Sequence, residues 1–229
     1  MRKLAIVGYG RMGRLIEQLA PQYDFEVALK LDEFNNANGA GLTAENFAGV
    51  DAAIDFSIPP VVPANVEGIA ALGVNIVVGT TGWLEHLDRV KGAVEKNRIG
   101  LVWSPNFSIG VNAFFKLVAE AARLFDQEPE YGSWAWEIHH SAKKDAPSGT
   151  LLKLVDEMKK AGYSRNIDVA SSRAGAIPGT HEIGFDSAAD TVTLRHTARS
   201  REGFARGALK AAQWVVGKKG FHEFGDIEF

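Results

Sequence analysis

A glycine-rich segment directly after the first short apolar run limits the folds open to this chain. Residues 4–7 are apolar, and Gly8-Tyr9-Gly10-Arg11-Met12-Gly13 follow at once with the spacing G-x-G-x-x-G. Between a strand and a helix, the first glycine allows a tight turn, the second lets the backbone approach a pyrophosphate, and the third lets helix and strand pack closely. The free N–H groups at the start of the helix then face the anion. The segment predicts a Rossmann-type dinucleotide site.

A carboxylate lies at the distance from the glycines that such a site requires. Asp32 follows the second apolar run, residues 25–31, about twenty residues after the glycines. A carboxylate there accepts hydrogen bonds from the ribose hydroxyls of NAD, whereas Lys30, close by, could attract the 2′-phosphate of NADP. The pattern leaves NADH and NADPH both open. The alternative, a glycine-rich turn that binds nothing, is disfavoured by the adjoining strand, helix and acid.

The alternation of strand-like and helix-like segments predicts an α/β fold. Short apolar runs recur at residues 52–56, 74–78 and 100–103, and segments with helical apolar spacing lie between most of them. Short runs without polar alternation suit strands that are buried on both faces of a sheet. Strands that alternate with helices in this way form right-handed βαβ units, so the sheet is expected to be parallel.

The pattern changes after Ser104, and a second lobe is predicted from there. In this lobe we predict helices over residues 111–125 and 151–162, and strands over residues 131–140, 181–185 and 191–196. A final helix over residues 204–216 follows the lobe. We predict two domains. Residues 1–107 with 204–229 form a Rossmann-type lobe with a parallel sheet, and residues 108–203 form an inserted α+β lobe with a mixed open sheet.

Composition and charge narrow the function classes. The 229 residues are 46% hydrophobic and 23% charged, which is typical of a folded globular protein. The net charge of −3 gives no sign of the basic face that nucleic-acid binding needs. Cysteine is absent, which excludes disulfides, thiolate nucleophiles and cysteine-ligated metals. The chain has no apolar run of the roughly 18 residues that a membrane span needs, and its first apolar run is too short for a signal peptide. We therefore expect a cytoplasmic protein with no nucleic-acid or membrane partner.

Two later loops are placed to contact a dinucleotide. Gly79-Thr80-Thr81-Gly82 and Ser104-Pro105-Asn106-Phe107-Ser108 each follow a predicted strand. Open α/β sheets bind ligands at the carboxyl ends of their strands, where small residues and hydroxyls let a nicotinamide ribose approach. Taken alone, these loops are more typical of ordinary strand-to-helix turns with Thr or Ser caps.

The second lobe contains an unusual polar run where a predicted strand ends and a helix begins. It reads Glu137-Ile138-His139-His140-Ser141-Ala142-Lys143-Lys144-Asp145-Ala146-Pro147-Ser148-Gly149-Thr150. Adjacent strand residues face opposite sides, so His139 and His140 can share a pocket only at the strand end, where they lie. Ser148 could cap the helix, or the N–H groups there could hold a carboxylate. Two imidazoles and a lysine beside a helix N-terminus suit an anionic substrate, and imidazole gives or takes a proton near neutral pH.

The same run also fits a purely structural interpretation. Paired histidines occur at polar strand ends, Lys143-Lys144 is typical of a solvated pair, and Pro-Ser-Gly-Thr begins a helix without any ligand. His181 and His196 are separate in the sequence, and either could join His139 and His140 at a metal ion. No spacing of the H-E-x-x-H kind supports such a site, so we expect no metal.

The order and content of these motifs resemble the dihydrodipicolinate reductase family, also called 4-hydroxy-tetrahydrodipicolinate reductases. Residues 139–150 match the family pattern H-H-x-x-K-x-D-A-P-S-G-T, which is far more specific than the glycine loop. The family loop commonly reads G-x-x-G-R-M-G, one residue longer than here, but the spacing here is the ordinary Rossmann one, so we expect pyrophosphate binding to survive. Further similar segments span nearly the whole chain: Arg11-Met12-Gly13, Asp55-Phe56-Ser57, Gly79–Gly82, Asn106–Asn112, Pro178–His181, His196 with Ser200-Arg201, and Gly207–Ala212.

The resemblance implies a function and a site. The family reduces 4-hydroxy-tetrahydrodipicolinate to tetrahydrodipicolinate with NADH or NADPH in lysine and diaminopimelate biosynthesis, usually as a homotetramer built through the sheet of the second lobe. It implies that His139 is the catalytic proton donor or acceptor and that Lys143 is its acidic partner. The residues implied to bind the dicarboxylate substrate are His140, Lys143, Ser148, Gly149 and Thr150. Those implied to hold the cofactor are Gly8, Tyr9, Gly10, Arg11, Met12, Gly13, Asp32, Gly79, Thr80, Thr81, Ser104, Pro105, Asn106 and Phe107.

Three other function classes share some of these features. Another two-lobed Rossmann dehydrogenase, acting on an amino or sugar acid, would have the same cofactor loop and differ in substrate. A redox sensor that binds NAD(P)H would not need His139, Lys143 and Gly149-Thr150 together. A DNA-binding regulator lacks support, because the chain shows neither a basic face nor a recognisable reading helix.

Overall fold

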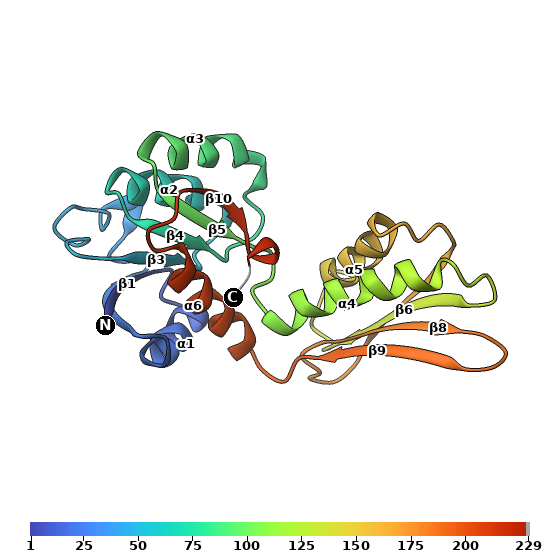
Figure 1. The fold of residues 1–229 in the computed structure, drawn as a ribbon. Helices are drawn as coiled ribbons and strands as arrows, with labels where there is room; N and C mark the ends of the chain where they lie inside the picture. The colour runs from blue at the N-terminus through green and yellow to red at the C-terminus, as the bar shows by residue number, and fades with distance from the viewer. Residues whose placement is uncertain (228–229) are drawn as a thin grey trace. The chain divides into compact units, whose positions relative to one another are not determined.

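The computed structural model describes residues 1–227, which form two compact units (Figure 1). The first unit contains Met1–Ile109 and the chain from Glu202 onward. The second unit is the inserted segment Gly110–Arg201.

The first unit is built on a parallel sheet of six strands, as the apolar runs predict. The strand order is β10-β5-β4-β3-β1-β2, and every pairing in it is parallel. The central strands β3, β4 and β5 are almost wholly buried, which explains why their sequences lack polar alternation. The strands are β1 (Arg2–Val7), β2 (Phe25–Leu31), β3 (Ala52–Asp55), β4 (Asn75–Val78), β5 (Gly100–Trp103) and β10 (Gly220–Glu223).

Helices cover both faces of this sheet (Figure 1). On one face, α2 (Val62–Ala71) and α3 (Leu87–Asn97) bury their apolar side chains against the strands. On the other face, α1 (Arg11–Leu19) and α6 (Glu202–Val215) form a second core with alternate residues of the same strands. Helix α6, which follows the inserted segment in the chain, thus completes the first unit.

The second unit is a mixed sheet of four strands with two helices on one face (Figure 1). The strand order is β7-β6-β8-β9; β6 pairs with β7 in parallel, and the other pairings are antiparallel. The core of this unit contains side chains of both helices, among them Phe114, Val118, Leu154 and Met158. The elements are α4 (Ile109–Phe125), β6 (Gly132–His139), α5 (Gly149–Lys160), β7 (Ile167–Arg173), β8 (Thr180–Asp186) and β9 (Thr191–Thr197).

Two strands were not predicted from the sequence, and both lie at a sheet edge. In β7 only Ile167 is buried, and the polar residues after it give no apolar pattern. In β10 there are four residues and none is fully buried. Each strand is held by hydrogen bonds to a single neighbour, so its sequence is little constrained by packing.

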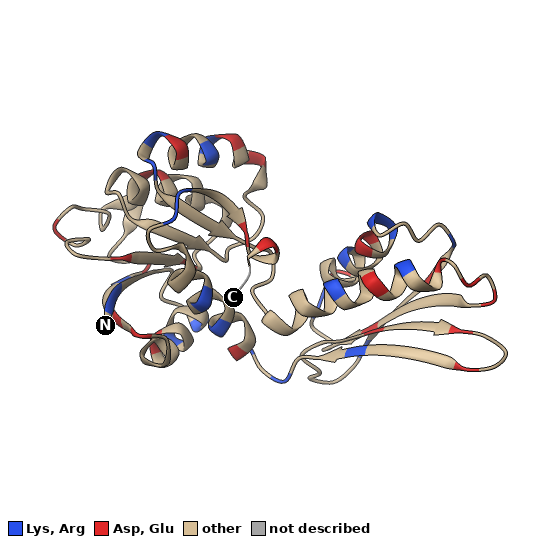
Figure 2. Cartoon of the chain, viewed as in Figure 1, with Lys and Arg blue, Asp and Glu red and all other residues tan. Residues whose placement is uncertain are grey.

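The described helices show no membrane-spanning character. Among residues 1–227, no helix combines the length and the hydropathy that a bilayer crossing needs. Basic and acidic residues are interspersed along α3, α4 and α5 (Figure 2).

We expect Gly207→Ala to lower the free energy of unfolding by about 2 kcal/mol or more, because overpacking forces backbone to move. Gly207 lies in α6 where the helix crosses the loop after β5, and a Cβ there would be 1.7 Å from the carbonyl oxygen of Phe107. Gly92 in α3 is the matched control, since a Cβ there meets nothing within 4 Å. Gly92→Ala should stabilise by about 0.5–1 kcal/mol. Urea unfolding measures both; equal stabilities for the two variants would contradict the packing described here.

Candidate active site

The glycine loop connects β1 to α1 and leaves the helix N-terminus open. Gly8 has a φ of +88°, and a Cβ there would lie 2.4 Å from the backbone of Phe56, so only glycine fits. A Cβ added to Gly10, by contrast, would meet nothing within 4 Å. Gly10 is the N-cap of α1, and no side chain caps the helix. The loop therefore offers backbone N–H groups and space to an anion, as a pyrophosphate site requires.

Asp32 keeps one carboxylate oxygen open at the end of β2. Its Oδ1 accepts hydrogen bonds from the backbone N–H groups of Phe34, at 2.9 Å, and Asn35, at 3.1 Å. No donor within residues 1–227 bonds its Oδ2. Lys30, two residues earlier, is instead engaged, with its Nζ 2.9 Å from Oε1 of Glu17. The geometry suits a ribose hydroxyl at Asp32 better than a phosphate at Lys30.

One of the two later loops, Gly79–Gly82, is hydrogen-bonded to the buried carboxylate of the first unit. Asp55 is fully buried, and its Oδ1 accepts hydrogen bonds from Oγ of Ser57, at 2.6 Å, and Oγ1 of Thr80, at 3.1 Å. Its Oδ2 accepts from Nδ2 of Asn65 at 2.9 Å. Burial raises the pKa of Asp55 despite these hydrogen bonds. The Thr80 hydroxyl therefore supports its own loop, while Thr81 beside it is exposed.

The loop after β5 is also held by its own side chains. The Ser104 hydroxyl donates to the carbonyl of Asn106 at 2.8 Å and accepts from its N–H at 3.1 Å. Phe107 is buried, and its ring lies 6.4 Å from that of Phe56 and 4.8 Å from that of Phe224. Of the predicted cofactor residues in this loop, 104–107, Pro105 is the exposed one.

In the second unit, Glu137 is the centre of the polar run. Glu137 is fully buried on β6. Its Oε1 accepts from the N–H of Ser148 at 2.8 Å, from Oγ of Ser171 at 3.0 Å and from Nη2 of Arg173 at 2.9 Å. The Ser148 hydroxyl makes a further short hydrogen bond to Oε2. Burial alone would raise the pKa of Glu137, but these donors outweigh burial and hold the pKa below its usual range.

His139 is buried between Glu137, His181 and Gly179. Its Nδ1 lies 3.4 Å from Oε2 of Glu137 without a hydrogen-bond alignment, and its ring centroid lies 5.0 Å from that of His181. A Cβ on Gly179 would lie 2.8 Å from Nε2 of His139, so the imidazole occupies the space above this glycine. Burial lowers the pKa of His139; Lys143 and Arg173 reinforce this effect, and Glu137 opposes it.

Strand pairing brings His181 to the polar run. His181 and His196 are distant from this run in the sequence, but the sheet places His181 directly opposite Glu137, with His196 opposite His181. The Nε2 of His181 lies 3.3 Å from Oε2 of Glu137. Burial, reinforced by His139, lowers the pKa of His181 to about 4. Ligand atoms of Glu137, His139 and His181 lie within 4.8 Å of one another, a geometry that could hold a metal ion although the sequence spacing did not suggest one.

Lys143 and the start of α5 already hold a carboxylate, that of Asp145. The Nζ of Lys143 lies 2.8 Å and 3.0 Å from the two oxygens of Asp145. Lys143 holds the pKa of the Asp145 carboxyl below its usual range, and the backbone N–H of Gly149 adds to the effect. The donors predicted to bind a substrate carboxylate are therefore arranged for one.

The other predicted substrate residues differ in accessibility. Ser148 is buried, and its side chain caps α5 by accepting from the N–H of Leu151 at 3.2 Å. Gly149 is exposed with open space where a Cβ would be, and Thr150 and His140 are half-buried. The hydroxyl of Ser148 is thus occupied within the protein, whereas Gly149, Thr150 and His140 are at least partly accessible.

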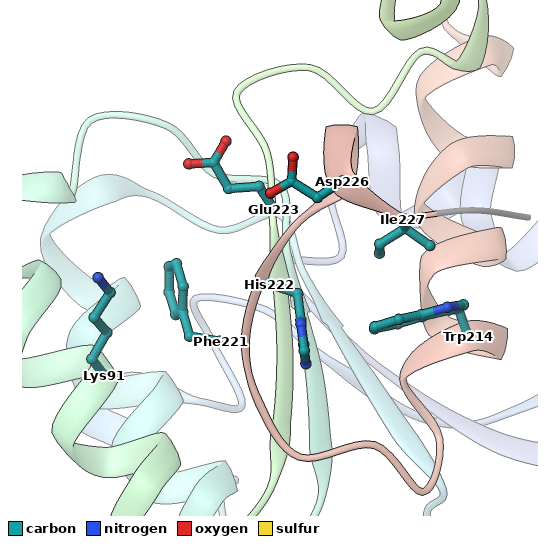
Figure 3. Close-up of a pocket in the computed structure, with 7 residues that line it drawn as sticks. All are labelled: Lys91, Trp214, Phe221, His222, Glu223, Asp226 and Ile227. Carbon is teal, nitrogen blue, oxygen red and sulfur yellow. The ribbon is translucent and has the colours of Figure 1, made fainter.

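A separate cavity lies along the edge strand β10 (Figure 3). Trp214 and His222 face each other on one side of the strand, with ring centroids 4.9 Å apart, and Lys91 lies near the Phe221 ring on the other side. None of the residues predicted from the sequence lines it.

Comparison with known proteins gives matches along nearly the whole chain. The family models described as dihydrodipicolinate reductase, N-terminus and C-terminus, match residues 2–107 and 110–227. The 4-hydroxy-tetrahydrodipicolinate reductase of Christiangramia forsetii is 33% identical, over 98% of this chain and 96% of its own. That of Methanosarcina mazei is 33% identical, over 99% of both chains.

Solved structures share the fold. A dipicolinate-bound dihydrodipicolinate reductase from Paenisporosarcina sp. TG-14 superposes with a TM-score of 0.83 at 23% identity, covering 100% of both chains. A myo-inositol 2-dehydrogenase from Lactobacillus plantarum has a TM-score of 0.59 at 10% identity, covering 94% of this chain and 88% of its own.

We expect the free energy of unfolding to decrease as the pH is lowered, and part of this decrease to depend on His181. The buried imidazole has a pKa of about 4, against 6.5 when exposed, so the unfolded chain binds more protons between these values and stability is lost as pH falls through the window. From pH 7 to pH 5 the loss due to His181 should be about 2 kcal/mol. His181→Asn should remove this part of the slope, whereas His86→Asn, at an exposed histidine, should not. Urea unfolding at each pH measures the slopes; parallel slopes for wild type and His181→Asn would contradict the assignment.

Proposed function

The chain belongs to the dihydrodipicolinate reductase family, and on that premise we propose that it reduces 4-hydroxy-tetrahydrodipicolinate to tetrahydrodipicolinate. One hydride comes from NADH or NADPH, one proton is taken up and one water leaves. The reaction belongs to lysine and diaminopimelate biosynthesis. The homotetramer and the cytoplasmic location implied by the resemblance stay predictions.

The observation that carries this proposal is the carboxylate held beside a buried imidazole. Lys143 and the first N–H of α5 already bind the Asp145 carboxylate, so they suit a carboxylate of a dicarboxylic substrate. His139 lies in the same run at the end of β6. In this proposal Lys143, His140, Gly149 and Thr150 bind the substrate, Ser148 holds the helix N-terminus in place, and His139 supplies the proton.

The glycine loop fits a pyridine nucleotide. The open space before Gly10 and the uncapped N-terminus of α1 would receive the pyrophosphate, and Oδ2 of Asp32 would accept from the ribose. The bound nicotinamide supplies the hydride. The loops of Gly79–Thr81 and Ser104–Phe107 would border the cofactor through their backbone and through exposed Thr81 and Pro105.

His139→Gln should reduce turnover by about 100-fold or more, because a positioned general acid contributes that much. NADH affinity, followed by fluorescence, should stay unchanged. Turnover is measured as NADH oxidation with the unstable substrate made in situ from pyruvate and aspartate semialdehyde by the preceding synthase. His86→Gln, at an exposed histidine, is the matched control. Oxidation by the wild type that does not depend on the synthase would refute the proposed substrate, and full turnover by His139→Gln would refute the role of His139.

We further propose that NADH is preferred over NADPH, because Asp32 would repel a 2′-phosphate and Lys30 is paired with Glu17. Asp32→Asn keeps an oxygen for the N–H groups of Phe34 and Asn35 but removes the charge. We expect kcat/KM for NADPH relative to NADH to rise about tenfold, which corresponds to about 1.4 kcal/mol. Asp88→Asn, on the surface of α3, should leave the ratio unchanged. A ratio that is the same in wild type and Asp32→Asn would contradict this proposal.

A further inference from the structure

We propose that Glu137 is the positioning residue of this site: its buried carboxylate orients the His139 imidazole with Nδ1–H toward Glu137, and fixes that imidazole relative to the start of α5. The inference rests on the proposed function, because it assigns Glu137 a role in the same site. It goes beyond the residues implied by the family resemblance, which do not include Glu137.

Glu137 is hydrogen-bonded to two other segments through its two oxygens. Arg173 and Ser171 reach Oε1 from the neighbouring strand β7. Ser148 reaches Oε1 with its N–H and Oε2 with its hydroxyl, from the residue that caps α5. A displacement of this carboxylate would therefore move the helix N-terminus that is proposed to bind substrate.

The sheet geometry explains why Glu137 faces the two imidazoles. Glu137 and His139 are two residues apart on β6, so their side chains point to the same face. Across the sheet, Ser171, Glu137, His181 and His196 lie in one row on neighbouring strands. The row brings Oε2 of Glu137 to 3.4 Å from Nδ1 of His139 and 3.3 Å from Nε2 of His181.

This arrangement favours one tautomer of His139. An ionised carboxylate beside Nδ1 stabilises a proton there and disfavours a lone pair. The contact is longer than an aligned hydrogen bond, as is common in unliganded catalytic sites. With Nδ1 protonated, Nε2 is the nitrogen left to exchange a proton, and it lies over Gly179, which has no side chain to cover it.

The elements packed around His139 together present charges of both signs to it. Glu137 from β6 and Asp145 from the following loop raise its pKa, whereas Lys143 from the same loop and Arg173 from β7 lower it. His181 on β8 is kept from protonating by burial, by His139 and by His196 on β9. Glu137 is thus the nearest charge that favours the protonated form of His139, and its loss should lower the pKa of His139.

The same cluster is less suited to a metal ion. Glu137, His139 and His181 bring three ligand atoms close together, but Ser148 and Arg173 already occupy the carboxylate oxygens. A cation bound at Glu137 would also lie near the Arg173 guanidinium. We therefore argue for a proton, and not a metal, between the carboxylate and the imidazole.

The wild-type protein provides the first test, without any substrate. The chain has only six histidines, so ¹⁵N NMR of the imidazoles, assigned with His139→Gln, can read the tautomer of His139 directly. We expect the Nδ1–H form in the wild type. In Glu137→Gln we expect a shift toward the Nε2–H form and a pKa of His139 lower by about one unit. A wild-type Nε2–H tautomer, or an unchanged titration in Glu137→Gln, would overturn the proposal.

Kinetics test whether this positioning matters for turnover. We expect kcat of Glu137→Gln to fall about 100-fold with the KM for NADH unchanged, because misplaced catalytic groups cost about that much. The limb of the pH profile on which activity is lost as His139 deprotonates should move to lower pH. Glu120→Gln, at an exposed ion pair on α4, is the control. A loss of turnover with an unmoved pH profile would mean that Glu137 only holds the fold together. Because the NMR readout needs no substrate, failure of the proposed reaction would be recognised separately.

Discussion

Among residues 1–227, each unit keeps one carboxylate fully buried, and the surrounding chain supplies the hydrogen-bond donors that permit it. An unpaired buried carboxylate costs several kcal/mol, which is a large part of the roughly 5–15 kcal/mol by which a typical domain is stable. Asp55 receives only neutral donors, and burial raises its pKa. Glu137 receives the Arg173 guanidinium as well, and its pKa falls below the usual range. At Asp55 burial outweighs the neutral donors and raises the pKa, whereas at Glu137 the hydrogen bonds from Ser148, Arg173 and Ser171 together outweigh burial.

These carboxylates also place the loops that matter for function. Asp55 binds the turn after β3, helix α2 and the loop after β4 together through Ser57, Asn65 and Thr80. The turn at Phe56 in turn packs against Gly8, so the glycine loop rests on a support that is itself anchored. Glu137 does the same for β6, β7 and α5. In both units a buried, hydrogen-bonded carboxylate thus holds together the segments that carry residues accessible to a ligand.

The sequence predicted the features that depend on local pattern. The glycine spacing after an apolar run specified the β1–α1 turn, and unbroken apolar runs specified the buried parallel strands. The edge strands β7 and β10 were missed because neither is packed enough to need an apolar pattern. The pairing of Glu137 with His181 was missed for another reason. It depends on the register between β6 and β8, and α5 and β7 separate these strands in the chain, so no local spacing encodes it. Alternation along β6, by contrast, does place Glu137 and His139 on the same face of the strand.

The charge balance at His139 couples protonation to substrate binding in the proposed reaction. Burial keeps the imidazole neutral in the absence of ligand, with Lys143 and Arg173 opposing a positive charge. A dicarboxylate bound at Lys143 would offset these cations and raise the pKa of His139, as Asp145 and Glu137 already do in part. By linkage, a substrate that favours the protonated imidazole is itself bound more tightly when the imidazole is protonated. The proton needed for the reduction would thus be gained at the step in which the dianionic substrate enters, and Glu137 would direct it to Nε2 by holding the other nitrogen.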